Sequence, residues 1–367
     1  MKLRNKIAIG FLSIVLLAVG SLAITISYTT DCPTAPVAAE EGQTMNAIRA
    51  YCYGSPDVLS YAEVAPPKPA DDELLVRVHA AGVNPLDWHY MRGSPYFIRL
   101  FAGLGAPEDP RVGVDFAGTV EAVGAAVTRF KPGDQVFGGA NGAFAEYLTI
   151  RENRAVAIKP EDVDFGSAAG VPIAGITAIQ ALQEHGKLQP GQRVLINGAS
   201  GGVGTYAVQI AKAMGADVTG VCSGRNAEMV KSIGADRVIN YKQEDYTTSG
   251  EQYDLIVDMV GNHSPLANSR LLTPEGKLII VGGAKGDWFA PLKGPIVAAI
   301  SNLFVDQELK TFTARLRPKD LAALADYMAQ GVVTTVIDQR FPLVEAAEAV
   351  RYSETGRARG KIILEIP

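Results

Sequence analysis

The chain has 367 residues, of which 47% are hydrophobic and 20% charged, a composition typical of a folded protein of about two domains. Lys and Arg number 34 against 39 Asp and Glu, which gives a formal net charge of −5. Because binding to phosphates needs a basic face, this balance excludes a nucleic-acid partner. Three widely spaced cysteines and four histidines without paired spacing predict neither a disulfide scaffold nor a local metal site.

The N-terminal region contains an uncharged apolar segment, residues 7–26. As a helix it would be about 30 Å long, the thickness of the hydrocarbon core of a bilayer, so it predicts a single-pass membrane anchor. Lys2, Arg4 and Lys6 precede it, and this bias places the N-terminus on the cytoplasmic side. A cleaved signal peptide is the competing interpretation. We therefore expect an anchor or signal over residues 1–30 and a protein held at a membrane.

The rest of the chain divides into four segments of different pattern. Residues 31–44, rich in Pro, Ala, Glu and Gly, predict an unstructured linker. From 45 to 170 short apolar runs alternate with Gly and Pro turns, which indicates a β-rich, barrel-like domain. From 171 to 305 buried strands alternate with amphipathic helices, which predicts an α/β domain with a doubly wound parallel sheet. We expect residues 306–367 to return to the first domain.

A glycine-rich turn follows the predicted strand from Arg193 to Asn197. The turn reads GASGGVG over residues 198–204 and leads directly into an amphipathic helix. Such a turn lets the backbone approach a pyrophosphate at the positive end of the helix dipole, because no Cβ stands in the way. We predict that a dinucleotide binds here, at Ala199, Ser200, Gly201, Gly202, Val203 and Gly204.

The following strand ends without the acidic residue that binds the ribose of NAD(H). It runs instead into Cys222-Ser223-Gly224-Arg225-Asn226, and an arginine beside hydroxyl and amide donors suits a 2′-phosphate. We therefore predict NADP(H) as the cofactor; the alternative is that Arg225 is only a solvated surface residue. Two later strand ends at the same edge of the sheet predict walls of the nicotinamide site, namely Gly261, Asn262, Gly282 and Gly283.

These residues resemble the medium-chain dehydrogenase/reductase superfamily, in its zinc-free, quinone-oxidoreductase-like branch. The marks of the resemblance are GVNPLDW at 82–88, GVDFAGTVEAVG at 113–124, FKPGDQVFG at 130–138, AGITAIQAL at 174–182, GASGGVG at 198–204 and GKIIL at 360–364. The resemblance implies a GroES-like barrel with an inserted Rossmann domain. It also implies loss of zinc, since Asn84 stands where zinc enzymes have a cysteine and Val114-Asp115 where they have a His-Glu pair.

The resemblance also implies roles for single residues. Asn84 would face the nicotinamide and the substrate. Beyond the glycine turn, the cofactor contacts would be Thr177, Ser223, Arg225, Asn226, Tyr241 and, near the phosphates, Lys361. In related enoyl reductases a tyrosine after this asparagine is the acid, so Tyr90 and Tyr96 are the candidate proton donors. The alternative is that they only line the cleft and water is the donor.

Without a metal that activates an alcohol, reduction is the favoured direction. We expect an enzyme that transfers hydride from NADPH to a quinone or to the C=C bond of an α,β-unsaturated carbonyl. The alternatives are a metal-free NADP-dependent alcohol dehydrogenase and a non-catalytic, redox-sensing NADPH-binding protein. Apolar runs at 97–101 and 291–305 predict an apolar substrate, and the second favours a buried or dimer-facing helix over a lipid-facing one. A homodimer is common in similar proteins.

Overall fold

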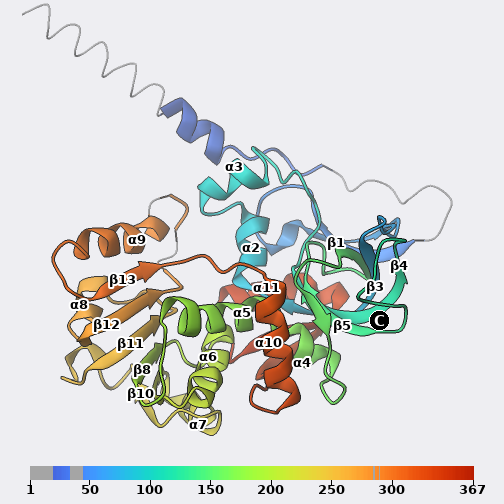
Figure 1. The fold of residues 1–367 in the computed structure, drawn as a ribbon. Helices are drawn as coiled ribbons and strands as arrows, with labels where there is room; N and C mark the ends of the chain where they lie inside the picture. Colours follow the sequence, from blue (N-terminus) through green and yellow to red (C-terminus); the bar gives the residue numbers. More distant parts are fainter. Residues whose placement is uncertain (1–19, 34–43, 284–285, 289) are drawn as a thin grey trace, which may run out of the picture.

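The computed structural model describes residues 20–33, 44–283, 286–288 and 290–367. Two β-sheets with their helices lie side by side along the molecule (Figure 1). One sheet combines strands from the first and last parts of the body, whereas the other is built from a continuous middle stretch. The middle stretch is therefore inserted into a domain that the two ends of the body build together.

The first sheet is mostly antiparallel and has the order β14-β15-β3-β4-β5-β7, with β6 also paired to β3. Its strands are β3 (Glu73–Val83), β4 (Asp115–Val123), β5 (Gln135–Gly139), β6 (Tyr147–Arg151), β7 (Val156–Ile158), β14 (Ile337–Pro342) and β15 (Lys361–Glu365). In β3 every second side chain, at Leu74, Val76 and Val78, is fully buried, as the period of a strand requires. This alternation builds the barrel core and confirms the predicted GroES-like domain.

Short elements surround this sheet. β1 (Met45–Ala50) and β2 (Leu59–Val64) form a separate antiparallel pair, and β1 reaches the barrel through a bridge between Ala47 and Ala145. The helices on this side are η1 (Pro56–Val58), α2 (Pro85–Arg92), η2 (Tyr96–Ile98), α3 (Arg99–Ala102), α4 (Phe165–Ala169), η6 (Leu343–Glu345) and α11 (Ala346–Glu354).

The second sheet is parallel throughout and has the order β10-β9-β8-β11-β12-β13. Its strands are β8 (Arg193–Asn197), β9 (Asp217–Cys222), β10 (Arg237–Asn240), β11 (Tyr253–Asp258), β12 (Leu272–Ile280) and β13 (Glu308–Thr311). Its helices are α5 (Pro172–Ile179), η3 (Gln180–His185), α6 (Gly202–Ala213), η4 (Gly224–Asn226), α7 (Ala227–Ser232), η5 (Tyr246–Thr248), α8 (Pro265–Ser269), α9 (Ala290–Ser301) and α10 (Pro318–Ala329).

Both faces of this parallel sheet are covered, which explains why its strands are continuous apolar runs. Val194 and Ile196 of β8 belong to the core that α5, α6 and α10 complete. Leu195, between them, points to the other core, which Ala298 of α9 joins. The predicted doubly wound Rossmann sheet is therefore confirmed.

The predicted membrane anchor is wrong on this structure. No helix among the described residues is long and apolar enough to cross a membrane. Of the predicted span, residues 20–26 lie within the described residues, where they are helical. The earlier part of the segment and residues 34–43 of the predicted linker lie outside the described residues. After the helix the chain folds onto the body, where the N–H of Thr30 donates to the carbonyl of Gly105 at 2.9 Å.

A disulfide joins Cys32 to Cys52, with 5.1 Å between the two Cα atoms. The sequence predicted no disulfide scaffold, and this single disulfide was not anticipated. Their spacing of 20 residues gave no signal, because the two meet only where the N-terminal segment packs against the loop after β1. The third cysteine, Cys222, is a buried free thiol, and burial raises its pKa to about 11.

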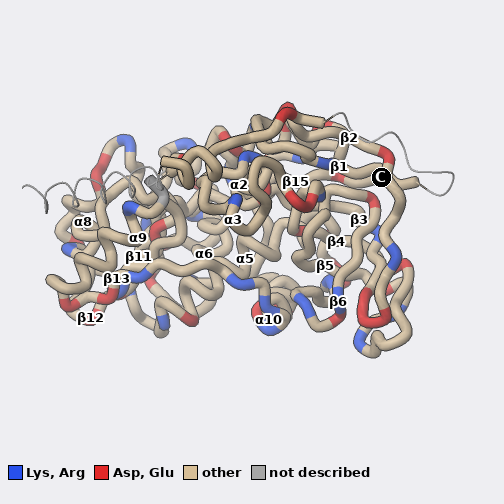
Figure 2. Tube along the Cα trace, turned by 90° about the horizontal axis from the view of Figure 1, so that it is seen from above, with Lys and Arg blue, Asp and Glu red and all other residues tan. Residues whose placement is uncertain are grey.

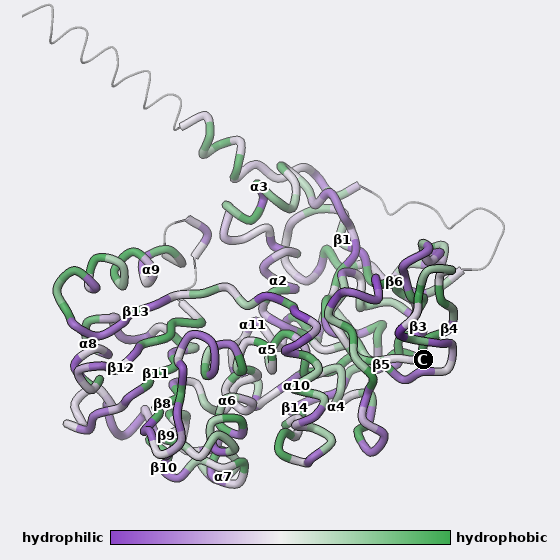
Figure 3. Tube along the Cα trace, viewed as in Figure 1, coloured by the Kyte–Doolittle hydropathy of each residue, from purple (hydrophilic) through white to green (hydrophobic). Residues whose placement is uncertain are grey.

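The surface carries both charge signs and two apolar regions. Figure 2 shows Lys and Arg interspersed with Asp and Glu along the chain. Figure 3 shows hydrophobic stretches along α9 and near α3. Within the single chain Ile296 and Ile300 of α9, and Phe304 beyond it, are exposed rather than buried. The apolar side chains named for this helix therefore face outward, although Ala298 of α9 is buried, and a dimer-facing helix stays a prediction.

Candidate active site

Asn84 is the centre of a buried polar cluster where β3 ends and α2 begins; it is 1% exposed. Its Nδ2 donates to Oδ2 of Asp115 at 2.9 Å, and its Oδ1 accepts from Nζ of Lys361 at 2.6 Å. The backbone N–H of Asn84 donates to Oδ2 of Asp87 at 2.7 Å, which is half of a capping box. Pro85 at the first helical position also favours a helix start here. Together these bonds hold the Asn84 amide in one orientation.

Burial shifts the pKa of each charged group in this cluster. It raises the pKa of Asp87 to about 8 and that of Asp115 to about 6, although Lys361 opposes both shifts. Burial lowers the pKa of Lys361, against the attraction of Asp115, whose Oδ2 lies 3.8 Å from Nζ. The cluster therefore contains one ion pair and a second carboxyl group, Asp87, that favours its protonated form near neutral pH.

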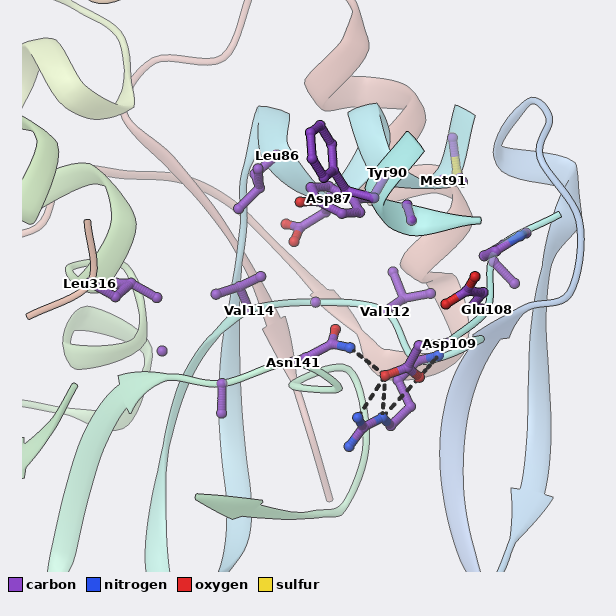
Figure 4. Close-up of a pocket in the computed structure, with 18 residues that line it drawn as sticks. Leu86, Asp87, Tyr90, Met91, Glu108, Asp109, Val112, Val114, Asn141 and Leu316 are labelled. Atoms are coloured by element: carbon purple, nitrogen blue, oxygen red, sulfur yellow. Dashed lines mark hydrogen bonds and ion pairs between the residues drawn. The ribbon is translucent and has the colours of Figure 1, made fainter. Parts of the chain in front are cut away.

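A pocket of about 500 Å³ opens beside this cluster (Figure 4). Leu86, Val114 and Leu316 line its apolar end. Helices α2 and α3 and the loops around β4 and β5 supply its other walls, which include Asp87, Tyr90, Met91, Phe101, Ala102, Glu108, Asp109, Arg111, Val112, Ala140 and Asn141. One wall of the pocket is therefore the helix that Asn84 begins.

The far end of the pocket is polar. Nη2 of Arg111 donates to Oδ2 of Asp109 at 2.6 Å, and Nδ2 of Asn141 donates to the same oxygen at 2.8 Å (Figure 4). Burial opposes ionisation of Asp109, yet the hydrogen bonds from Arg111 hold its pKa below the ordinary value. The pocket thus offers an apolar end next to the Asn84 cluster and a charged end away from it.

The two candidate proton donors occupy different places. Tyr90 lines the pocket beside Asp87 (Figure 4). Tyr96 is not among the lining residues; its ring lies edge-on to Trp288, with 4.8 Å between the ring centroids, and under the guanidinium of Arg99 at 4.6 Å. The structure therefore brings only Tyr90 to the pocket, and its role as proton donor stays a prediction.

The glycine turn is shaped by two different requirements. A Cβ at Gly204 would lie 2.1 Å from the carbonyl oxygen of Gly198, so only glycine lets α6 pack this close to β8. A Cβ at Gly201, the N-cap of α6, would meet no atom closer than 3.5 Å. Open space therefore faces the start of the helix, where a pyrophosphate would lie. Ala199, Ser200, Gly202 and Val203 complete the turn.

The turn and the Asn84 cluster are joined by the last strand of the chain. The N–H of Gly360 donates to the carbonyl of Ser200 at 2.9 Å, and Gly201 and Gly360 form a parallel bridge. The side chain of Lys361 passes Gly202, whose Cβ would lie 3.2 Å from its Cδ, before its ammonium reaches Asn84. Lys361 thus lies beside the turn with its methylenes, while its charge faces the cluster.

The residues predicted for the ribose phosphate gather at the end of β9. Nδ2 of Asn226 donates to Oγ of Ser200 at 2.9 Å, while its buried Oδ1 has no hydrogen-bond partner among the described residues. A sugar hydroxyl is the kind of donor that satisfies such an acceptor. Arg225 donates through Nη2 to the carbonyl of Arg357 at 2.9 Å. Ser223 is buried beside them, and Tyr241 has an exposed ring.

The predicted nicotinamide walls are held by hydrogen bonds at the ends of β8, β11 and β12. Nδ2 of Asn197 donates to Oδ1 of Asn262 at 2.8 Å, and the N–H of Gly261 donates to Asp258 at 2.9 Å. A Cβ at Gly282 would lie 2.1 Å from the Met259 carbonyl, so the strand ends pack tightly. Gly283 lies against them, since a Cβ at Gly261 would meet its Cα at 3.0 Å. Thr177 of α5 donates its hydroxyl to the Ile173 carbonyl at 2.6 Å.

Sequence reasoning missed three residues of this region. Asp87 is the fourth residue of Asn84-Pro85-Leu86-Asp87, a capping-box spacing that signals its place. Asp115 interrupts an otherwise apolar strand start, which signals a buried polar role. Arg99 interrupts the apolar run Phe97 to Phe101 and is buried, and that interruption was its only signal.

A barrel domain, an inserted parallel sheet and a glycine turn at their junction define a dinucleotide-dependent dehydrogenase, and comparison with known proteins agrees. Residues 70–161 match the family model of the alcohol dehydrogenase GroES-like domain, and residues 233–364 match that of the zinc-binding dehydrogenases. The chloroplastic quinone oxidoreductase QR1 of Triphysaria versicolor is 36% identical over 349 residues, covering 88% of this chain and 99% of the relative.

Two further relatives extend the comparison. The trans-enoyl reductase pgmF of Aspergillus terreus is 34% identical over 322 residues, covering 80% of this chain and 86% of that protein. The crystal structure of Escherichia coli quinone oxidoreductase complexed with NADPH has a TM-score of 0.75 and 27% identity, covering 87% of this chain and 99% of that one. The chain belongs to the medium-chain dehydrogenase/reductase superfamily, in its quinone-oxidoreductase-like branch.

The zinc that gives one family model its name does not fit these residues. The amide of Asn84 is bonded to Asp115 and to Lys361, and the ammonium of Lys361 places a positive charge where a cation would compete with it. In the described parts of the chain no three His, Cys, Asp or Glu side chains are grouped so as to hold a metal ion. The bonded set of Asn84, Asp115 and Lys361 is therefore unsuited to hold zinc.

Proposed function

We propose that the protein transfers hydride from NADPH to a quinone or to the C=C bond of an α,β-unsaturated carbonyl compound. The observation that carries this proposal is the position of the pocket beside the buried Asn84 cluster. Its apolar end, lined by Leu86, Val114 and Leu316, adjoins the buried Asn84 cluster instead of a metal site. The quinone oxidoreductase and trans-enoyl reductase among the relatives support the same two classes of acceptor.

The inserted sheet offers a fitting site for NADPH, which supplies the hydride when bound. Gly201 leaves space at the start of α6 for the pyrophosphate, and Asn226 offers an unpaired acceptor for a ribose hydroxyl. Arg225, together with Ser223, would bind the 2′-phosphate. The related E. coli enzyme was crystallised with NADPH, which supports this choice. We propose the remaining contacts at Thr177, Tyr241, Gly261, Asn262, Gly282, Gly283 and the aliphatic part of Lys361.

The chain's own residues would exclude water and supply a proton. Leu86, Val114 and Leu316 surround the reacting end of the acceptor with apolar side chains. Hydride addition to an enone leaves an enolate, which needs one proton at the neighbouring carbon. Tyr90 lines the pocket and is partly exposed, so its phenol can give that proton and regain one from solvent. Asn84 does not line the pocket; with both amide atoms bonded it fixes the start of α2, which does line it, and moves no proton.

NADPH consumption with quinones, enones and aldehydes tests the proposal. We expect turnover of quinones or enones, and Tyr90→Phe should lower kcat for enones by about 100-fold, as expected for loss of a general acid. Tyr96→Phe, outside the pocket, is the matched control and should keep kcat. If both variants keep kcat, water is the donor. Turnover of aldehydes alone, or NADPH binding without any turnover, would contradict the proposed reaction.

We further propose that the active form is a homodimer. The exposed apolar side chains Ile296 and Ile300 of α9 support it, because they lie near the edge strand β13 of the parallel sheet. Sedimentation velocity at micromolar concentration should give a dimer, and Ile300→Asp should shift it toward monomer. A wild-type monomer would contradict this part of the proposal.

A further inference from the structure

The chain just after the N-terminal helix is fastened by a single buried side chain. Arg99, the first residue of α3, is 4% exposed. Its Nη1 lies 3.2, 3.0 and 2.8 Å from the carbonyl oxygens of Ile26, Ser27 and Tyr28 and 3.1 Å from Oγ1 of Thr29, and its two hydrogens are shared among these four acceptors. These carbonyls belong to the last turn of the helix over residues 20–27 and the residue after it, where a cation is favoured by the helix dipole.

The same guanidinium also holds the surrounding loop. Its Nε donates to the carbonyl of Gly93 at 2.8 Å, and its Cζ lies 4.6 Å from the ring centroids of both Tyr53 and Tyr96. Tyr96 in turn packs edge-on against Trp288, which follows β12 of the other sheet. A row of packed groups, Tyr53, Arg99, Tyr96 and Trp288, therefore runs from the barrel domain to the inserted domain.

Two further links fasten the N-terminal segment, residues 26–32, to the same loop. Thr29 pairs with Gly105, and Thr30 donates to the Gly105 carbonyl. The disulfide joins Cys32 to Cys52, next to Tyr53, whose hydroxyl donates to the carbonyl of Gly103 at 2.8 Å. The segment is thus bonded on both sides of α3.

This loop forms a wall of the substrate pocket. Phe101 and Ala102, on the helix that Arg99 begins, line the pocket, and Phe101 is 82% exposed. α3 spans only four residues, too short to hold its own position in water. Its placement depends on Arg99 and on the N-terminal segment that Arg99 binds.

We propose that Arg99 is a positioning residue for the substrate, and that the disulfide-linked N-terminal segment, residues 26–32, is a structural part of the substrate site. This inference rests on the proposed function, because the acceptor is what the wall would position. No carboxylate lies within ion-pair distance of Arg99 among the described residues; Asp287 acts on its charge from further away, and carbonyls and aromatic faces make its direct contacts.

Arg99→Lys and Arg99→Met test the positioning role. Lys keeps the charge and can still bond carbonyls, but it has no planar group that stacks between two rings while it bonds them. We expect both variants to raise KM for an enone or quinone by about tenfold, since a displacement of ~1 Å in a substrate contact is costly, with kcat and the Kd for NADPH within about twofold of wild type. Arg129→Met, an exposed arginine of the same domain, is the control and should keep KM. A lower melting temperature with unchanged KM would overturn the proposal.

The disulfide provides a second, independent test of the proposal. Dithiothreitol would be oxidised to its cyclic disulfide as Cys32 and Cys52 are reduced to two thiols. Cys32→Ser/Cys52→Ser should raise KM in the same direction as Arg99→Met, and reduced wild type should match it. Cys222→Ser, with both bridge cysteines intact, should respond to the reductant as wild type does. A KM that is indifferent to reduction in wild type would overturn the role of the segment.

A readout without turnover separates this inference from the proposed function. In a Trp88→Phe background Trp288 is the sole tryptophan, and it packs on Tyr96 in the row that Arg99 supports. Arg99→Met and the double serine variant should both shift its fluorescence emission to longer wavelength. If wild type turns over no acceptor while the shift occurs, the proposed function fails and the contact of Arg99 with the loop stands. If turnover is normal and neither KM nor emission changes, the positioning role fails.

Discussion

Nζ of Lys361 donates a 2.6 Å hydrogen bond to Oδ1 of Asn84, which ties the last strand of the chain to the start of α2 across 277 residues of sequence. The residue before Lys361 is bonded to the glycine turn, so one strand joins the pocket, the buried cluster and the predicted cofactor site. Nothing in the sequence marks Asn84 and Lys361 as a pair. Only the return of the chain end to the barrel brings them together.

Lys361→Met should destabilise the protein strongly. It leaves Asp115 as a buried carboxyl group without its cation and Asn84 without a donor, and loss of one partner of a buried pair costs about 3–5 kcal/mol. Urea denaturation at pH 7 measures the loss. The double variant Lys361→Met/Asp115→Asn removes the unpaired charge and should recover part of it. A single variant as stable as wild type would show that the pair contributes nothing.

Two glycines of the turn should separate folding from cofactor binding. Gly204→Ala places a Cβ 2.1 Å from the Gly198 carbonyl and should lower the melting temperature. Gly201→Ala meets no atom closer than 3.5 Å and should keep the melting temperature, yet weaken NADPH binding by about tenfold or more, because the Cβ faces the pyrophosphate. Thermal unfolding and a fluorescence titration with NADPH give the two values. If Gly201→Ala binds NADPH as tightly as wild type, the glycine turn is not part of the cofactor site.

Arg225→Ala should weaken NADPH binding much more than NADH binding. A charge-assisted hydrogen bond to phosphate is worth about 1.5–3 kcal/mol, which corresponds to roughly 10- to 100-fold in Kd for NADPH. Lys231→Ala on α7 removes an equally exposed charge of the same domain and is the control. Calorimetric titration of each variant with both nucleotides checks this. If the substitution changes the Kd values for NADPH and NADH equally, Arg225 does not bind the 2′-phosphate and is only a surface residue.

Asp87 predicts how stability depends on pH. Its pKa is raised from 3.8 to about 8 in the folded protein, so between these values the folded state holds a proton that the unfolded state has lost. The contribution of this group is complete below about pH 4 and is lost as the pH rises through about 8. Wild type should therefore lose stability from about pH 6.5 to about 8.5, above the pKa of Asp115, which is about 6.

Asp87→Asn is the matched variant for that measurement. The amide is neutral and still accepts the N–H of Asn84, so the decline over this pH range should become smaller. Lys361, whose pKa burial lowers, is present in both proteins and contributes similarly to both curves. Urea unfolding at several pH values gives the two profiles, and parallel profiles would show that Asp87 ionises normally.

The sequence predicted the two domains and the glycine turn because both depend on local patterns. Alternating burial in β3 and apolar runs such as β8 are properties of neighbouring residues, and the turn is a continuous motif. The apolar segment before residue 27 misled for the same reason. Its composition matched a membrane span, whereas no helix among the described residues could cross a membrane, and Arg99 binds the last carbonyls of the helix that ends at residue 27.

The rest of the site depends on contacts between distant residues. The bond of Lys361 with Asn84, the meeting of Cys32 with Cys52 and the packing of Arg99 against the N-terminal segment all require the finished fold. The same holds for the two tyrosines, six residues apart, of which only Tyr90 reaches the pocket. Neither the periodicity of the sequence nor the spacing of its motifs predicts contacts between residues so far apart in the chain.

The most direct test of the central claim is NADPH oxidation at 340 nm by purified protein that has been dialysed against a chelator. We expect steady turnover of a quinone or an enone with NADPH, markedly slower turnover with NADH, and no gain when zinc is added back. Turnover that vanishes on chelation and returns with zinc, or a protein that binds no nicotinamide nucleotide, would contradict it.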